Sequence, residues 1–288
     1  MRGFLFAAKI SMRYAGWMLS RLFGKHPSSP NPDPGPQLCM LALASGAGLT
    51  DSGIVAAWQA LFPDASPLCA TGAEKQVLSF ESEGLSIMVA GMPMPIPEAE
   101  ISGACARSWM WPRASEEMRR QKIHAVVTVP SGDRSRAGAV RQAVAVSRVA
   151  AAICHSGEAV GVYWGSSYQV HNPKMFIEGV QVMTGKDSLP CMLWVGLAVS
   201  ASSPEGPYSL STHGLRSFGH KELEVVDARF SIGVLRTTVL EIINYVLHAG
   251  PVLKHGQTLG SDGSTRWKII HADSRFRPGE PVIRLGVS

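Results

Sequence analysis

The segment FSIGVLRTTVLEIINYVLHAG, residues 230–250, constrains the fold most strongly. Its apolar side chains recur three and four residues apart, which is the spacing of one face of a helix: Ile232, Leu235, Val239, Ile242, Ile243 and Val246. Gly250 and Pro251 predict where this helix ends. Residues 222–226, ELEVV, alternate polar and apolar as a half-buried strand does. A strand that leads into a long amphipathic helix predicts a packed core.

Further strands and helices alternate along the chain. Strands are predicted over 39–45, 76–81, 85–90, 122–129 and 159–164, and helices over 54–62, after Pro97 and over 135–156. This order is that of a split βαβ or ferredoxin-like unit. After residue 185 the pattern restarts, with strands over 192–200, 208–214, 222–226, 267–271 and 281–285 around the long helix. We predict an α+β fold of two ferredoxin-like or split βαβ lobes with mixed or antiparallel sheets, preceded by an N-terminal helix.

The start of the chain differs in composition from the rest. Residues 26–37, HPSSPNPDPGPQ, hold five prolines and favour an extended linker. In the preceding segment Arg2, Lys9, Arg13 and Ser20 would share one narrow helical face. Such a helix could dock on the body or a partner, or lie on a membrane surface; membrane-surface helices usually carry a wider charged face, so we favour docking. The predicted segments are a basic amphipathic helix (1–25), the Pro-rich linker (26–37), an N-terminal lobe (38–185) and a C-terminal lobe (186–288).

The net charge of +5 is concentrated at the N-terminus. Residues 1–36 carry five basic residues and one acidic residue, whereas the rest carries 22 basic and 21 acidic residues. Nucleic acids are recognised by clustered Lys and Arg, so a nearly neutral body argues against nucleic-acid binding. The five cysteines are widely spaced and form no CxxC pair, which argues against a disulfide framework or a zinc site and favours the reduced cytoplasm.

The sequence contains no recognisable catalytic motif. Residues 45–53, SGAGLTDSG, follow a strand and open a helix, but their glycines match neither of the common nucleotide-binding loops. No GxSxG occurs, and Cys154 and His155 are neighbours along the chain rather than a nucleophile and base that meet through the fold. We therefore predict no catalytic residue, cofactor or metal site.

Glu222 and Glu224 are the residues that an enzyme could use for acid–base catalysis, if the chain were one. Two residues apart on a strand, they face the same side, and His213 and His220 lie nearby in sequence. Acid–base catalysis needs two carboxyl groups with different pKa values; the simpler interpretation is a solvated strand face. His171 could join these histidines as a metal ligand, but no HxH or HxxxH spacing supports it.

The segment GVYWGSSYQVHNPKMF, residues 161–176, mixes aromatic and short polar side chains just past a strand. Such a mixture is typical of protein-recognition surfaces. The alternative is that Tyr163 and Trp164 fill the junction between the lobes, and both interpretations stand open. Our candidate partner-binding residues come from this segment and from the turn before the long helix: Tyr163, Trp164, Tyr168, His171, His213, Arg216, His220, Glu222 and Glu224.

Residues 161–176 and 212–227, with the following helix and residues 253–260, resemble a bacterial family known as domain of unknown function 4261. The resemblance rests on a Gly-Leu/Met-x-x-Phe-Gly-x-x-Glu-Leu-Glu pattern and a later His/Asp-Gly-x-Thr turn, here Gly214–Glu224 and His255–Thr258. We expect it to cover residues 38–288. No reaction comes with the family, so no catalytic residue is carried over. Such families often occur beside interbacterial toxins and secretion systems, including type VI secretion.

The resemblance and the motifs together predict a cytoplasmic bacterial immunity protein that neutralises a secreted toxin by direct protein–protein contact. An accessory or adaptor protein of a secretion system is one alternative. An uncharacterised enzyme with a His/Glu site in the C-terminal lobe is another. The expected partner is the cognate toxin, and membrane contact is expected, if anywhere, through residues 1–25.

Overall fold

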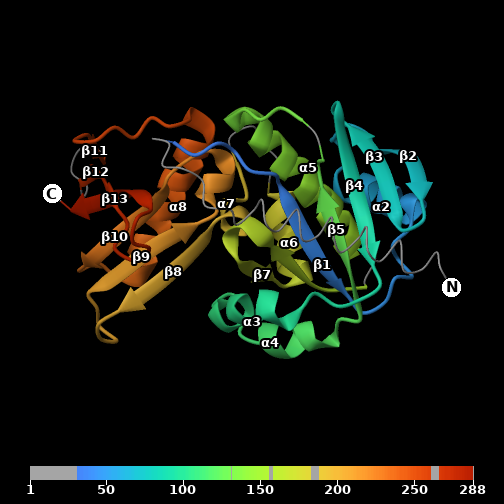
Figure 1. The fold of residues 1–288 in the computed structure, drawn as a ribbon, viewed down its shortest axis with the longest axis horizontal. Helices are drawn as coiled ribbons and strands as arrows, with labels where there is room; N and C mark the ends of the chain where they lie inside the picture. Colours follow the sequence, from blue (N-terminus) through green and yellow to red (C-terminus); the bar gives the residue numbers. More distant parts are fainter. Residues whose placement is uncertain (1–30, 131, 156–157, 183–187, 261–265, 288) are drawn as a thin grey trace.

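The computed structural model describes residues 31–130, 132–155, 158–182, 188–260 and 266–287. The predicted N-terminal helix, residues 1–25, lies outside these ranges, as do residues 26–30 of the linker. Within them the protein has an α+β fold with two sheets, which confirms the predicted fold class (Figure 1). One sheet has seven strands in the order β2-β3-β4-β5-β1-β6-β7, and the other has six in the order β11-β12-β13-β10-β9-β8.

The seven-stranded sheet is antiparallel at every pairing. Its strands are β1 (Leu38–Leu43), β2 (Cys69–Glu74), β3 (Val77–Ser82), β4 (Leu85–Met92), β5 (Ile123–Thr128), β6 (Ala159–Trp164) and β7 (Gln169–His171). Strand β1 lies between β5 and β6, which are joined by helix α5 (Arg136–His155) and run parallel to each other. This is the split βαβ arrangement.

Helices cover β1 on both faces, which explains why this strand is a continuous apolar run with every residue buried. Cys39, Leu41 and Leu43 pack in a core that includes α5 and α2 (Asp51–Leu61). Met40 and Ala42 point the other way, into a smaller core with α3 (Glu98–Arg107) and α4 (Ala114–Glu117). The short turn η1 (Met118–Arg120) follows α4.

The six-stranded sheet is mixed, and helix α8 (Ile232–Ala249) packs on one of its faces. Its strands are β8 (Gly196–Ala201), β9 (Tyr208–His213), β10 (Glu222–Ala228), β11 (Thr258–Leu259), β12 (Trp267–Asp273) and β13 (Pro281–Val287). Strands β10 and β13 are parallel neighbours. The parallel pair is therefore adjacent here, not split as in the first lobe.

One aromatic stack crosses from the first sheet to the second. The ring of Trp194, in the short helix α7 (Cys191–Trp194), stacks on Trp164 of β6 at 6.3 Å and on Phe218 at 5.5 Å. Its indole Nε1 donates to Ser147 Oγ of α5 at 2.8 Å. These side chains belong to one continuous apolar cluster that contains residues of both lobes. The lobes therefore share a core.

Several predicted elements need correction. Residues 192–200 were predicted as one strand, but they hold the end of α7 and then β8, because an uninterrupted apolar run does not distinguish a buried helix from a strand. The sequence patterns did not predict β2, β7 or α6 (Pro173–Gln181). Helix α5 is long and apolar enough to cross a membrane by length and composition alone, yet 72% of that window is buried inside the protein.

Candidate functional site

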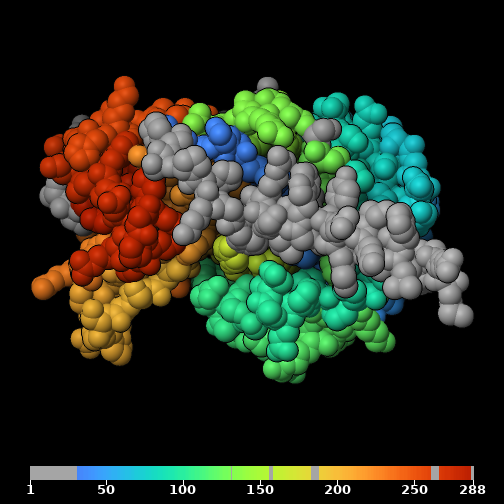
Figure 2. Space-filling model, viewed as in Figure 1, coloured from blue at the N-terminus to red at the C-terminus, as the bar shows by residue number. Residues whose placement is uncertain are grey.

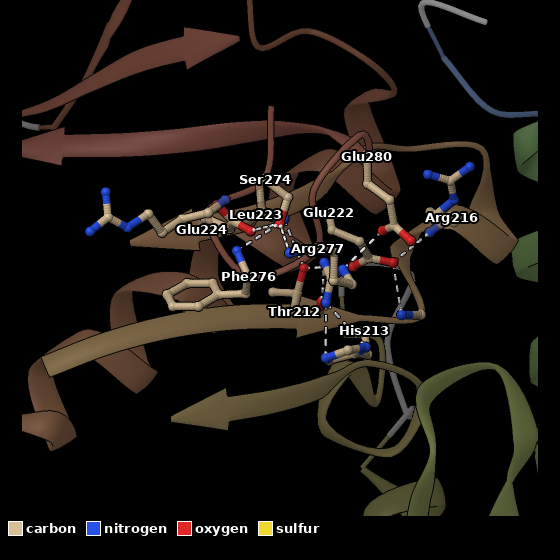
Figure 3. A network of polar contacts seen from close by, with 12 residues as sticks. Thr212, His213, Arg216, Glu222, Leu223, Glu224, Ser274, Phe276, Arg277 and Glu280 are labelled. Carbon is tan, nitrogen blue, oxygen red and sulfur yellow. Dashed lines mark hydrogen bonds and ion pairs between the residues drawn. The ribbon is translucent and has the colours of Figure 1, made fainter. Parts of the chain in front are cut away.

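Glu222 and Glu224 lie on one side of β10, as predicted, but they are buried at 4% and 0% exposure. The predicted solvated strand face is therefore wrong. Figure 3 shows both carboxylates enclosed by neighbouring loops and strands. A buried carboxylate is stable only where protein donors replace the lost water, and such donors are present at both residues.

Glu222 holds a tight turn in place. Its Oε1 accepts from the backbone N–H groups of Gly214 at 2.9 Å and Arg216 at 3.1 Å, and its Oε2 accepts from Thr212 Oγ1 at 2.6 Å. Gly214 and Gly219 bound this turn, with φ of 116° and 78°, in the left-handed region that favours glycine. The conformation of the turn therefore depends on one carboxylate and two glycines.

Glu224 braces the other end of the same strand face. Its Oε1 accepts from Ser274 Oγ and its Oε2 from Arg275 N at 3.0 Å, with Arg284 Nη2 at 3.8 Å. Ser274 lies 50 residues further along the chain, so this contact fastens the β12–β13 connection to β10. Both carboxylates act as acceptors for fixed protein donors.

Arg277, in the same connection, joins His213 to the site (Figure 3). Its Nη1 lies 2.9 Å from His213 Nε2, its Nε donates to Glu280 Oε2 at 2.9 Å, and its Nη2 donates to Thr212 O at 3.3 Å. Burial, assisted by the charge of Arg277, lowers the pKa of His213 to about 4. A neutral imidazole can accept a hydrogen bond from the guanidinium.

Tyr168 completes this site from the other lobe. Its ring meets His213 edge-on, with ring centroids 6.4 Å apart, and 37% of the residue is exposed. Its backbone is left-handed, with φ 52° and ψ 42°, a conformation that side chains other than Gly, Asn and Asp rarely adopt. Burial, followed by the charges of Glu100 and Glu280, raises its pKa. We call Tyr168, His213, Arg277 and Glu280 the Tyr168 cluster.

The remaining candidates in the first lobe are buried. Tyr163 packs under α3 in the smaller core, and Trp164 is fully buried in the stack with Trp194. His171 Nε2 lies 3.1 Å from Leu193 O, and burial lowers its pKa to about 4. Of the two open interpretations, the geometry favours junction filling for Trp164, and a partner could not reach these rings without rearranging the core.

His220 and Arg216 are not members of the Tyr168 cluster. His220 is 4% exposed, and burial, with the charge of Arg136, lowers its pKa to about 4. It lines a cavity of about 20 Å³ with His271, which has room for about one water molecule. Arg216 is partly exposed, and its backbone N–H binds Glu222. The candidate histidines and acids therefore do not converge on one cavity.

Sequence patterns missed Arg277, Glu280 and Ser274. These residues lie in the turn SRFRPGE, residues 274–280, whose composition indicates only a loop. Across the described ranges no three His, Cys, Asp or Glu side chains are grouped as metal ligands would be. All five cysteines lie within these ranges and are free thiols; Cys69 is exposed and the other four are buried.

No curated protein and no solved structure matches the chain. One family model does match, over a segment shorter than the expected 38–288. The matched segment does not include the first lobe, in which Tyr168 lies. Residues 211–286, which run from the end of β9 into β13, match the family model of a domain of unknown function, DUF4261, and this confirms the resemblance for the C-terminal lobe.

Proposed function

We propose that this chain is a protein-binding protein whose partner docks on the Tyr168 cluster. The observation that carries the proposal is the conformation of Tyr168, an exposed aromatic residue held with a left-handed backbone at the junction of the lobes. Such a backbone costs about 1–3 kcal/mol and persists where the surroundings impose it, most often at functional sites. Tyrosine and arginine are also the side chains that most often dominate binding energy at protein interfaces.

The surroundings of Tyr168 support a rigid anchor. His213 packs against its ring and is itself held by Arg277, which is fixed by Glu280 and Thr212 O. The turn that follows His213 is held by the three hydrogen bonds to Glu222. A side chain that is ordered before binding loses less conformational entropy when the partner docks.

The biological role that fits best is immunity: the chain would neutralise a secreted bacterial toxin in the cytoplasm by covering its active surface. This role rests on the expectation that families of this kind occur beside interbacterial toxins and secretion systems. Free cysteines without disulfides fit the reduced cytoplasm that the role requires. An accessory role in a secretion system would use the same surface.

The enzyme alternative has less support. It requires His213, His220, Glu222 and Glu224 to act together, yet both oxygens of each carboxylate already bind protein donors. His213 and His220 have different charged neighbours, Arg277 and Arg136. An acid–base pair must instead reach the same substrate atoms.

The test is co-expression with a candidate toxin, chosen from the genes beside the one that encodes this chain. We expect the unaltered chain to bind the toxin and to restore growth. Tyr168→Ala should raise the dissociation constant about thirtyfold or more, which is the effect of losing an interface hot spot. Tyr245→Ala is the matched control, because Tyr245 is 47% exposed on α8, away from the cluster. Equal binding by both variants, with both folded by circular dichroism, would contradict the proposed docking surface; toxicity unaffected by the unaltered chain would contradict immunity.

A further inference from the structure

The four end strands of the two sheets differ in how they are protected. A strand at the end of a sheet exposes unpaired backbone N–H and C=O groups, and proteins usually guard it by shortness, bulges or charge. Strands β7 and β11 span three and two residues, and β2 carries a register shift near Gly72 and ends on Glu74. Strand β8, Gly196–Ala201, has none of these protections.

Strand β8 is regular and uncharged. Its sequence is GLAVSA, and it pairs with β9 without a register shift from Gly196 to Ala201. Within the described ranges its other edge pairs with no strand. Exposure rises along β8, from buried Gly196 to Val199 at 36% and exposed Ser200 and Ala201. Figures 1 and 2 show the β8–β9 hairpin (gold) projecting from the lower side of the C-terminal lobe.

The first residue of β8 is covered by the other lobe. A Cβ built on Gly196 would lie 2.7 Å from Ser167 O and 3.3 Å from Gln169 Cγ. Because Gly196 packs this closely against the other lobe, we take Leu197–Ala201 as the segment open to a further strand. Val199 is the middle residue of this open segment.

We propose that two copies of this chain associate through antiparallel pairing of their β8 strands about a two-fold axis at Val199. This register places Val199 opposite its own copy, Leu197 opposite Ala201, and Ala198 opposite Ser200. Apolar residues then face apolar residues on the side of the sheet that carries Leu197 and Val199, because alternate residues share a face. The two six-stranded sheets become continuous.

The charge pattern selects a second copy over an unrelated partner. In a two-fold strand pair any charge at the centre faces its own like charge, which is destabilising. An unrelated partner is instead selected by complementary charges. The open segment contains no charged residue, as self-pairing requires. Two-fold dimers are also the commonest symmetric assembly.

This contact is independent of the proposed partner at Tyr168, and the test uses the purified chain alone. A single strand pair buries less than the about 800 Å² per partner of a stable interface, so the dimer should appear only as the concentration rises. Sedimentation velocity should show the mass rise from 30.8 kDa toward twice that value. Over the same series, hydrogen exchange should slow at the backbone amides of β8.

Val199→Lys should weaken the dimer about tenfold or more, because it places two like charges opposite each other. Ser200→Lys, at an exposed position, is a second variant that should weaken it without disturbing the core face. Ala73→Lys is the matched control: it adds the same charge to an exposed residue of the end strand β2 and should leave the dimer unchanged. A chain that stays monomeric at every concentration would overturn the proposal. So would a dimer that survives both β8 variants when these are folded, or slowed exchange confined to other elements.

Discussion

Glu222 offers the sharpest test of how the turn beside the Tyr168 cluster is stabilised. In Glu222→Gln one carboxylate oxygen becomes an NH₂ group. If the remaining oxygen faces Gly214 N and Arg216 N, the NH₂ faces Thr212 Oγ1, which already accepts from Leu223 N at 2.8 Å. The Thr212 hydroxyl then loses its acceptor, and both backbone bonds lose charge assistance. The opposite orientation leaves two backbone donors without an acceptor.

The expected cost follows from these bonds. A hydrogen bond to a charged group contributes about 1.5–3 kcal/mol, a neutral one about 1, and a buried unsatisfied polar group costs about 1–3. Glu222→Gln should therefore lower the free energy of unfolding by about 3–5 kcal/mol. Glu280→Gln is the control, because its ion pair with Arg277 is 43% exposed on the Glu280 side and should cost less than about 1 kcal/mol.

Urea unfolding of the two variants and the unaltered protein measures both values, provided that the free energy of unfolding changes with urea concentration at the same slope in all three. A loss below about 1 kcal/mol for Glu222→Gln, or a loss no larger than that of Glu280→Gln, would show that the buried carboxylate does not hold the turn.

Three further substitutions test other parts of the fold. Gly214→Ala should lower the free energy of unfolding by about 3 kcal/mol, because φ is 116° there and the new Cβ would lie 2.6 Å from Trp194 O. Gly84→Ala is the control and should lower it by about 1 kcal/mol, because φ is 72° and nothing lies within 4 Å of the new Cβ. Thermal unfolding compares the two variants. The pKa of His171 is lowered to about 4 by burial, so the unfolded chain binds its proton first. His171 should therefore account for up to about 3 kcal/mol of the stability lost as pH drops from about 6.5 to 4, beside the losses from His213 and His220. His171→Gln should remove its own share of that loss in a pH series of urea unfolding. Trp194→Phe removes the hydrogen bond to Ser147 and part of the stack and should cost about 2 kcal/mol in the same assay; an unchanged midpoint would contradict the role of the stack.

The sequence predicted the elements whose side-chain periodicity is strong. Helix α8 and strand β10 lie where their patterns placed them. The fate of Glu222 and Glu224 could not be predicted in this way. Alternation gives the face on which a side chain lies, but not whether a segment 50 residues away covers that face, as Ser274 does.

The Tyr168 cluster was predicted only in part. Tyr168 and His213 were candidates because of their residue types, while Arg277 and Glu280 were missed because a Pro-Gly turn carries no periodic pattern. The left-handed backbone of Tyr168 falls in the tight loop that joins β6 to β7, where Tyr168 N donates to Gly165 O. The residue type does not indicate it, because tyrosine is not among the residues that favour this conformation.

The aromatic stack at Trp194 bears on how this domain family can be transferred between proteins. Residues 211–286 alone would retain Phe218 but lose Trp194, Trp164 and helix α5. An excised fragment would expose the apolar surface that these side chains cover and would tend to aggregate rather than fold alone. Any other chain that contains this segment must cover the same apolar surface with residues from outside it. Differences among such proteins should therefore be sought in the sequence that flanks the segment.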